Sequence, residues 1–178
     1  SPCCLRPDTA CVSSGIAEYL GPARHAAKGK DRQVLSLLRG RFRARTAEGP
    51  ADIDRAQALR FRAFRGGEGR DADGFDDICT HVLVEEVRSG TLVCCFRLLP
   101  LTGGCEIARS YSAQYYDLER LAAYPGRMVE MGRFCIHPDW HDPDILRVAW
   151  GAMTAYVDSE GVEMLFGCSS TKTKVLDG

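Results

Sequence analysis

The stretch "VEMGRFCIHPDW", residues 129–140, places Glu130 and Arg133 three positions apart in a short apolar run that Pro138 ends. The run over residues 128–137 predicts a buried strand. Two opposite charges in such a strand are costly to remove from water unless they are paired or used by a substrate. The stretch therefore predicts that the rest of the chain supplies partners for Glu130 and Arg133.

Strands and helices alternate in the pattern around this stretch. The expected strands cover residues 40–47, 80–87, 91–99, 128–137 and 162–170. The expected helices cover residues 52–65, with Asp52 as cap, 115–124 and 142–161. The last helix is the clearest, because Asp142 can cap it, Pro143 takes its first position and Gly161 lies beyond its end.

The order of these elements predicts an α/β fold with a mixed sheet flanked by helices. The strands at 80–87 and 91–99 are joined around Ser89 and Gly90 at hairpin distance, so this pair is antiparallel. The final strand, helix and strand require a parallel pair. The length of 178 residues and the hydrophobic content of 45% are typical of one soluble domain with its own core.

Composition argues against membrane-spanning, secreted and zinc-binding classes. No apolar run approaches the roughly 18 residues of a membrane span, and the first residues lack the apolar core of a signal peptide. Cys94, Cys95, Cys135 and Cys168 lie inside apolar stretches, which favours reduced core thiols. The other cysteines near the start lack the paired spacing of zinc ligands, so we expect a cytoplasmic protein with no metal site.

Charge is unevenly distributed although the net charge is −1. Residues 24–65 carry 12 Lys or Arg against 4 Asp or Glu, whereas residues 66–178 carry 10 against 18. A basic front of this kind suits nucleic acid, anionic lipid or an acidic protein, and it also suits an ordinary solvated helical face.

Arg97 indicates where a charged cluster forms. It lies within the apolar strand "LVCCFRLL", and a guanidinium there requires a carboxylate, which Asp73, Asp76 or Glu130 can supply. Such a cluster is either a structural network that anchors the loop at 66–79, or a site. In a site, a carboxylate takes a proton from a nucleophile or holds a cationic substrate.

Other candidate motifs are weak. His81 is either a base or a hydrogen-bonded core residue of its strand. Ser169 and Ser170 lack the tight turn of a serine hydrolase. The glycines of residues 66–70 follow a helix and lack the lysine of a phosphate-binding loop. These patterns favour neither hydrolysis by a serine triad nor nucleotide binding.

Seven segments in chain order carry a family resemblance: "LRFRAF", "DADGFDDICTHVLV", "VCCFRLLP", "YYDLERL", "VEMGRFCIHPDW", "LRVAWGAMTAYV" and "MLFGCSS". Over residues 40–170 the chain resembles the ornithine acyl-carrier-protein N-acyltransferases, which have the Gcn5-related N-acyltransferase fold. Four motifs are similar to those of the acyl-homoserine-lactone synthases as well: Arg60 with Phe64, Asp73 with Asp76, R-L-L-P from Arg97, and Glu130 with Arg133. The strand around His81 and the segment "LFGCSS" favour the ornithine branch.

The resemblance implies roles for these residues. Glu130 and Arg133 are the implied catalytic residues, with Glu130 as the proton acceptor for the α-amine of ornithine. Arg133 and Arg97 would hold the carboxylates of the cluster and the carboxylate of the substrate. Arg60, Phe64, Asp73, Asp76 and His81 complete the implied substrate site.

The resemblance also implies where the donor lies. The pantetheine arm and acyl group would lie between the strands at 133–137 and 162–168. The implied contact residues there are Phe134, Cys135, Ile136, Phe166 and Gly167. The acyl-phosphopantetheine of acyl carrier protein would be the donor, and no cofactor or metal is implied.

The implied organisation is a basic, partly helical N-terminal extension over 1–39, an acyltransferase-like domain over 40–170, and a tail over 171–178. The family fold continues after the strand that ends at Cys168 with a further helix and strands. We therefore expect either that the chain continues beyond the printed sequence or that this C-terminal part of the fold is missing.

The implied function is transfer of a 3-hydroxyacyl group from acyl carrier protein to the α-amine of ornithine, the first step of ornithine-lipid synthesis. An acyl-homoserine-lactone synthase or another amine acyltransferase is the enzymatic alternative. A non-catalytic acyl-binding module is the alternative from another class. We expect acyl carrier protein and ornithine as partners, peripheral contact with the anionic inner face of the membrane, and no nucleic acid.

Overall fold

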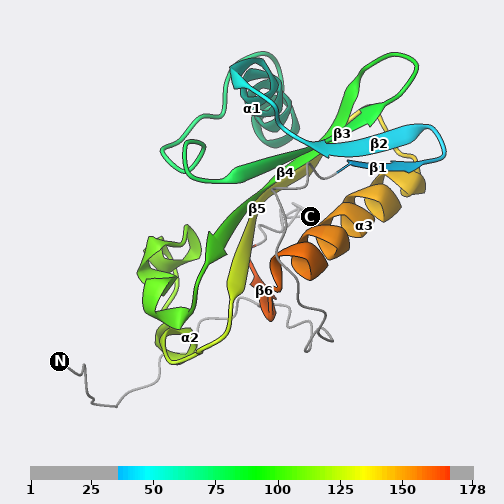
Figure 1. Cartoon of the computed structure of the whole chain (residues 1–178). Coiled ribbons are helices and arrows are strands. Elements are labelled where there is room, and N and C mark those ends of the chain that lie inside the picture. Colours follow the sequence, from blue (N-terminus) through cyan, green and yellow to red (C-terminus); the bar gives the residue numbers. More distant parts are fainter. Residues whose placement is uncertain (1–35, 169–178) are drawn as a thin grey trace, which may run out of the picture.

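The computed structural model describes residues 36–168 as one sheet with a helix on each face (Figure 1). Its elements in chain order are β1 (Ser36–Arg39), β2 (Phe42–Thr46), α1 (Pro50–Arg65), β3 (Thr80–Glu86), β4 (Leu92–Leu101), η1 (Gly104–Arg109), η2 (Ser112–Gln114), α2 (Glu119–Ala122), β5 (Met128–Ile136), α3 (Pro143–Glu160) and β6 (Met164–Phe166). Most of the expected N-terminal extension, the expected tail over 171–178, and Ser169 and Ser170 lie outside the described residues.

The sheet is mixed, as the sequence predicts. Its six strands lie in the order β1-β2-β3-β4-β5-β6. Every neighbouring pair from β1 to β5 is antiparallel, and β6 pairs parallel to β5. The α/β prediction is therefore confirmed, including the hairpin and the parallel pair at the end.

Helix α3 follows its sequence signals closely. The Asp142 carboxylate accepts a hydrogen bond of 2.9 Å from the backbone N–H of Asp144, and Pro143 occupies the first turn. Gly161 ends the helix with φ +62°, a left-handed conformation that glycine adopts without strain. These end signals set the bounds of the helix that covers one face of the sheet.

Two expectations about elements are wrong, and one strand is additional. The strand expected at 40–47 is present as β2, and Gly40, at φ +59°, turns the chain into it from the additional edge strand β1. Helix α1 starts at Pro50 instead of Asp52, since Asp52 binds Arg45 and the proline suits the first turn. The helix expected at 115–124 is only the short α2, preceded by the two 3₁₀ helices.

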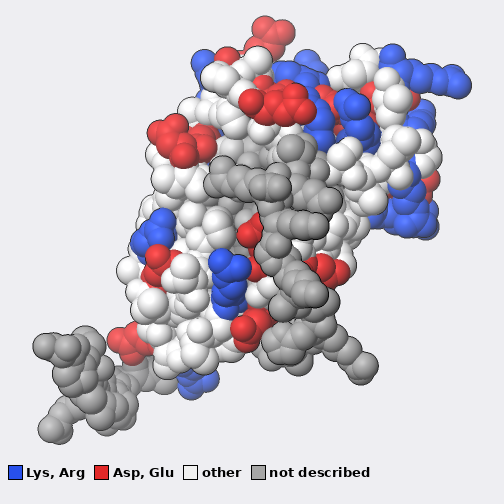
Figure 2. All heavy atoms as spheres, viewed as in Figure 1, with Lys and Arg blue, Asp and Glu red and all other residues white. Residues whose placement is uncertain are grey.

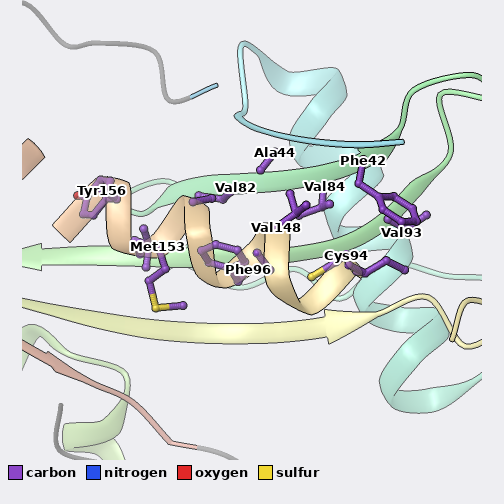
Figure 3. Packing of buried hydrophobic residues seen from close by; sticks show 14 of the residues in the cluster. Phe42, Ala44, Val82, Val84, Val93, Cys94, Phe96, Val148, Met153 and Tyr156 are labelled. Carbon is purple, nitrogen blue, oxygen red and sulfur yellow. The ribbon is translucent and has the colours of Figure 1, made fainter. Parts of the chain in front are cut away.

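The main core lies between the sheet and α3. Figure 3 shows Phe42, Val82, Phe96, Val148 and Met153 within this layer, and all of them are buried. A second cluster, including Leu59, Leu83, Cys95 and Cys135, lies between the sheet and α1. A third covers the sheet under η1 and α2. Both faces of the central strands are therefore covered, and several charged residues on the α1 face, including Arg60 and Arg97, are buried.

Candidate active site

An irregularity in β5 puts Glu130 and Arg133 on the same face of the sheet. Side chains of a regular strand alternate between faces, so residues three apart point to opposite sides. The register pairs Arg97 with Gly132 and Cys95 with Cys135, so that two residues, Arg133 and Phe134, stand opposite one residue of β4. This is the geometry of a β-bulge, and Arg133 has the left-handed φ of +52°. The extra residue returns Arg133 to the α1 face, where Glu130 also lies.

Arg97 is the centre of the charged cluster that the sequence predicts. Its Nη1 and Nη2 donate to the two oxygens of Asp73 at 2.6 and 2.9 Å, and Nη1 also donates to Asp76 Oδ1 at 2.8 Å. Only 3% of its side chain is exposed. The prediction that a carboxylate pairs with Arg97 is therefore confirmed, with Asp73 and Asp76 as the partners.

Arg60 reaches the same cluster from α1. Its Nη1 donates to Asp76 Oδ1 at 2.7 Å and its Nε to Asp71 Oδ2 at 3.0 Å, with 1% of the side chain exposed. Gln57 donates to Asp76 at 2.8 Å from one turn earlier in the helix. Asp71 was missed from the sequence because it stands outside the D-x-x-D spacing of Asp73 and Asp76.

Asp73 and Asp76 are held in the charged form. Burial alone would raise the pKa of Asp76, but hydrogen bonds from Arg60 and Gln57 and the charge of Arg60 lower it well below its usual range. The pKa of Asp73 is lowered in the same way, by Arg97 and Arg133 against the effect of burial. Both groups therefore act as anions at neutral pH.

His81 lies beside the cluster but is enclosed. It lies opposite Arg97 in the register of β3 and β4. Its Nε2 lies 3.0 Å from the backbone carbonyl oxygen of Asp76 and donates a hydrogen bond to that oxygen when it carries the proton. Burial lowers the pKa of the imidazole, so the ring is neutral at pH 7. This matches the hydrogen-bonded core histidine that the sequence left as one alternative.

Arg133 and Asp73 form the open edge of the cluster. Their side chains are 27% and 24% exposed, and Arg133 Nη2 donates to Asp73 Oδ2 at 3.2 Å. Arg133 Nε lies 3.5 Å from Asp71 Oδ2 and is buried with no hydrogen-bond partner in the described part of the chain. Arg133 thus retains donor capacity that Arg60 and Arg97 have used.

Glu130 binds Tyr111 and Ser112 and not the arginines of the cluster. Its Oε2 accepts from the backbone N–H of Tyr111 at 2.7 Å, and its Oε1 accepts from the N–H and the hydroxyl of Ser112 at 2.7 and 2.5 Å. Among the described residues, no ion pair joins Glu130 to Arg97 or Arg133. The buried carboxylate therefore holds the chain between η1 and η2 against β5.

Tyr111 connects the two charges of the opening stretch. Its ring centroid lies 5.3 Å from the Arg133 guanidinium carbon and 5.9 Å from that of Arg97, distances typical of cation–π contacts. The ring also packs edge-on against Phe75 and lies 5.2 Å from the Tyr115 ring. Burial and a hydrogen bond with Tyr115 raise the pKa of the Tyr111 hydroxyl. Sequence reasoning missed Tyr111, since "RSYSAQYY" carries no spacing that predicts a site.

The residues expected along the donor arm separate onto two faces. Phe134 stacks between Phe96 and Trp150 on the α3 face, and Ile136 packs in the same layer. The side chain of Cys135 points to the α1 face, where its sulfur lies 3.6 Å from that of Cys95. Phe64 packs against that second cluster, and Phe166 is buried in the third.

Strands β5 and β6 pair over only three residues. The parallel register joins Met128–Glu130 to Met164–Phe166, whereas β5 continues to Ile136. A Cβ atom on Gly167 would lie 2.3 Å from the carbonyl oxygen of Met131, so glycine is needed where the strands last approach each other. Beyond this point no described strand pairs with that edge of β5. An unpaired strand edge offers backbone groups to a ligand.

The arrangement brings together the guanidinium of Arg133, the carboxylate of Asp73 and the unpaired edge of β5. It suits an acceptor that carries charge and an extended donor arm. Within residues 36–168, no three His, Cys, Asp or Glu side chains are grouped as metal ligands. No helix among these residues is long and apolar enough to span a membrane.

A family model described as acetyltransferase (GNAT) domain matches residues 56–151. A solved structure, the AHL synthase LasI, superposes with a TM-score of 0.54 at 19% sequence identity and covers 71% of each chain. This structural likeness shows a shared fold.

Three curated relatives called L-ornithine N(alpha)-acyltransferase are similar in sequence. The protein of Brucella abortus (strain 2308) is 32% identical over 162 residues, covering 81% of this chain and 57% of the relative. That of Rhizobium meliloti (strain 1021) is 33% identical over 144 residues, covering 71% and 49%. That of Rhodobacter capsulatus is 32% identical over 145 residues, covering 72% and 56%. The chain thus spans about half the length of the curated relatives it matches.

The family model covers more than half of the 178 residues, from α1 into α3, and includes every residue of the charged cluster. The sheet is mixed, as the order of the elements predicts. The chain therefore belongs to the acetyltransferase (GNAT) domain family.

Proposed function

We propose that the protein is an N-acyltransferase that moves a 3-hydroxyacyl group from acyl carrier protein to the α-amine of ornithine, the first step of ornithine-lipid synthesis. The similarity to relatives called L-ornithine N(alpha)-acyltransferase supports this acceptor. The observation that carries the proposal is the position of the Asp73–Arg133 pair. It lies at the bulge of β5, beyond Glu130, the last β5 residue that pairs with β6.

The chemistry requires an uncharged amine beside a thioester. The amine nitrogen forms a bond to the thioester carbonyl carbon, the carbon–sulfur bond breaks, and the pantetheine sulfur leaves as a thiol after it gains a proton. The nitrogen, held first as an ammonium, loses one proton before the attack and a second after it, and the second balances the proton that the thiol gains. Backbone N–H groups on the open edge of β5 can stabilise the negative oxygen of the tetrahedral intermediate.

Glu130 is the proposed acceptor for the proton of the amine, directly or through a relay. The Ser112 hydroxyl donates to Glu130 Oε1 at 2.5 Å, and it is the group through which a proton can pass to the carboxylate. Asp73 would hold the ammonium form of the acceptor before the proton leaves. Arg60, Arg97 and His81 are buried, so their proposed role is to position Asp73 and Asp76.

The donor arm would run along β5 beyond the bulge. This path leads past Phe134 and Ile136 toward the loop between β5 and α3, with Gly167 opposite Met131 at its start. The side chain of Cys135 faces the other way, so its proposed contact is through the backbone alone. The apolar surface around Phe134 and Trp150 would receive the acyl chain.

A basic surface adjoins the end of this path. Arg side chains gather over the turn between β1 and β2 and the turn after β3 (Figure 2). Arg39, Arg41 and Arg88 are exposed there. Arg41 also pairs with Asp142 at 3.0 Å, which places this surface beside the loop after β5. Acyl carrier proteins are acidic, so this surface would receive the donor, and it would also contact anionic lipid at the inner membrane face.

Acyl transfer with defined acceptors tests the proposal. The protein is incubated with 3-hydroxyacyl carrier protein and ornithine, and thiol release and N-acylornithine are measured together. Release of thiol with formation of Nα-acylornithine is the expected result. Release that depends on S-adenosylmethionine would instead identify a lactone synthase, and binding of acyl carrier protein without release would identify an acyl-binding module.

A further inference from the structure

The three arginines of the cluster differ in how many of their donors are satisfied. Arg60 and Arg97 are almost fully buried, and their guanidinium groups bind Asp71, Asp73 and Asp76 through several hydrogen bonds each. Within the described residues, Arg133 makes one hydrogen bond, to Asp73, and its Nε lies 3.5 Å from Asp71 Oδ2 without a hydrogen bond. A guanidinium has five N–H donors, so Arg133 can bind a further anion.

The position of Arg133 is set by two independent features. The bulge gives it φ +52°, a conformation that is strained for a residue with a Cβ atom. The ring of Tyr111 lies 5.3 Å from its guanidinium carbon, within the range of a cation–π contact. Tyr111 is itself fixed by its backbone hydrogen bond to Glu130. An arginine held in this way is prepared for bidentate binding of a carboxylate.

The neighbouring charges select the kind of anion. Asp73 accepts from Arg133 at 3.2 Å and is also about one quarter exposed. The cationic guanidinium of Arg133 and the anionic carboxylate of Asp73 therefore lie side by side at the exposed edge of the cluster. An α-amino acid at neutral pH carries a carboxylate and an ammonium on the same carbon, and this pair of charges matches the two side chains.

We propose that Tyr111 is a positioning residue that holds Arg133 as the anchor for the α-carboxylate of the acceptor. The acceptor class is therefore a free α-amino acid, and simple amines and amino-acid amides are excluded. The inference rests on the proposed acyltransferase function, because it assigns the acceptor end of the same site. This role of Arg133 differs from that of Arg97, whose N–H donors already bind carboxylates of the chain.

Acceptor analogues test the anchor. L-Ornithine, L-ornithinamide and 1,4-diaminobutane are compared with the same acyl carrier protein donor, and kcat and KM are measured for each. The amide of ornithinamide cannot form the bidentate pair with Arg133 that a carboxylate forms, and a site that loses such a pair discriminates strongly between acceptors. The wild type should therefore prefer ornithine to ornithinamide by about 100-fold in kcat/KM. Equal use of ornithine and ornithinamide would overturn the proposal.

Variants then separate the anchor from its support. Arg133→Gly keeps the bulge, since glycine adopts φ +52° freely, and should remove the preference for ornithine over ornithinamide. Tyr111→Leu should raise KM for ornithine about tenfold with little change for ornithinamide, whereas Tyr111→Phe should stay close to wild type. Tyr116→Leu, at a half-exposed ring outside these contacts, is the matched control. A Tyr111→Leu variant that slows both acceptors equally would show a merely structural role.

Calorimetric titration without donor distinguishes this inference from the proposed function. Binding of ornithine but not ornithinamide, abolished in Arg133→Gly, supports the anchor even if no acylornithine forms. Formation of acylornithine with ornithine and ornithinamide bound equally would retain the acyltransferase and reject the anchor. The absence of any carboxylate-dependent binding would reject the anchor in either case.

Discussion

The carboxylate of Glu130 accepts a hydrogen bond of 2.7 Å from the backbone N–H of Tyr111, whose ring lies 5.3 Å from the Arg133 guanidinium carbon. The two charges of the opening stretch are thus linked through a third residue instead of pairing with each other. A change at Glu130 therefore acts on the chain at Tyr111 and Ser112 as well as on any proton transfer.

Replacement of Glu130 should lower turnover for two separable reasons. Glu130→Gln should reduce kcat by about 10²–10⁴-fold if the carboxylate accepts the proton. This loss should diminish at high pH, where the α-amine of ornithine is already neutral. A pH-independent loss, accompanied by faster hydrogen exchange at the Tyr111 and Ser112 amides, would assign Glu130 to anchoring alone. Ser112→Ala, which keeps both backbone hydrogen bonds, tests the relay.

Removal of Arg97 should destabilise the fold. Arg97→Met would leave the buried Asp76 and the partly exposed Asp73 with reduced compensation, and losing one partner of a buried pair costs about 3–5 kcal/mol. Urea denaturation measures the free energy of unfolding. Arg147→Met is the matched control, because the Arg147–Asp144 pair is exposed and should contribute less than about 1 kcal/mol. Equal effects of the two substitutions would contradict a buried network.

Gly167→Ala should impair activity more than stability. The added Cβ would lie 2.3 Å from the carbonyl oxygen of Met131, so β5 and β6 must move apart where the donor arm is proposed to enter. A displacement near 1 Å in a catalytic site can cost about 100-fold in rate, and kcat measures this. Gly49→Ala is the control, since its Cβ would meet nothing within 4 Å. Unchanged turnover in Gly167→Ala would place the donor elsewhere.

Stability should fall in acid through a second charged network on the α1 face. Burial alone would raise the pKa of Glu85, but hydrogen bonds from Arg45, Arg55 and Arg43 lower it from 4.5 to about 2. Between these values the unfolded chain binds a proton that the folded chain does not, so the free energy of unfolding decreases as pH falls from 4.5 to 2.

Denaturant midpoints across this pH range check the prediction. Glu85→Gln should flatten the decrease, whereas Glu119→Gln, at an exposed position, should leave its slope unchanged. A Glu85→Gln variant with the wild-type slope would show that other carboxylates control acid unfolding.

The basic surface should affect the binding of acyl carrier protein and not the acyl-transfer step. Arg39→Glu combined with Arg88→Glu should raise KM for acyl carrier protein about tenfold and weaken its salt dependence, with kcat little changed. Lys28, Lys30 and Arg32, which the sequence also places in the basic front, lie outside the described residues. Arg120→Glu on α2 is the control for a charge change elsewhere. Wild-type donor affinity in the double variant would remove this surface from the docking site.

Local signals in the sequence determined the elements that depend on neighbouring residues. Asp142, Pro143 and Gly161 mark the ends of α3 because caps act within one helical turn. Arg97 in an apolar strand predicts carboxylate partners because a buried guanidinium without them is too costly. The sequence offered Asp73 and Asp76 among these partners, and the family motifs added Arg60.

Tertiary structure alone decided how the opening stretch is arranged. Strand periodicity places Glu130 and Arg133 on opposite faces, and only the pairing of β5 with β4 shows the extra residue that reunites them. Backbone N–H groups bind Glu130, and every residue except proline carries such a group. No side-chain pattern therefore predicts these hydrogen bonds. Tyr111 enters the site for the same reason: its position depends on a hydrogen bond to a residue 19 positions away along the chain.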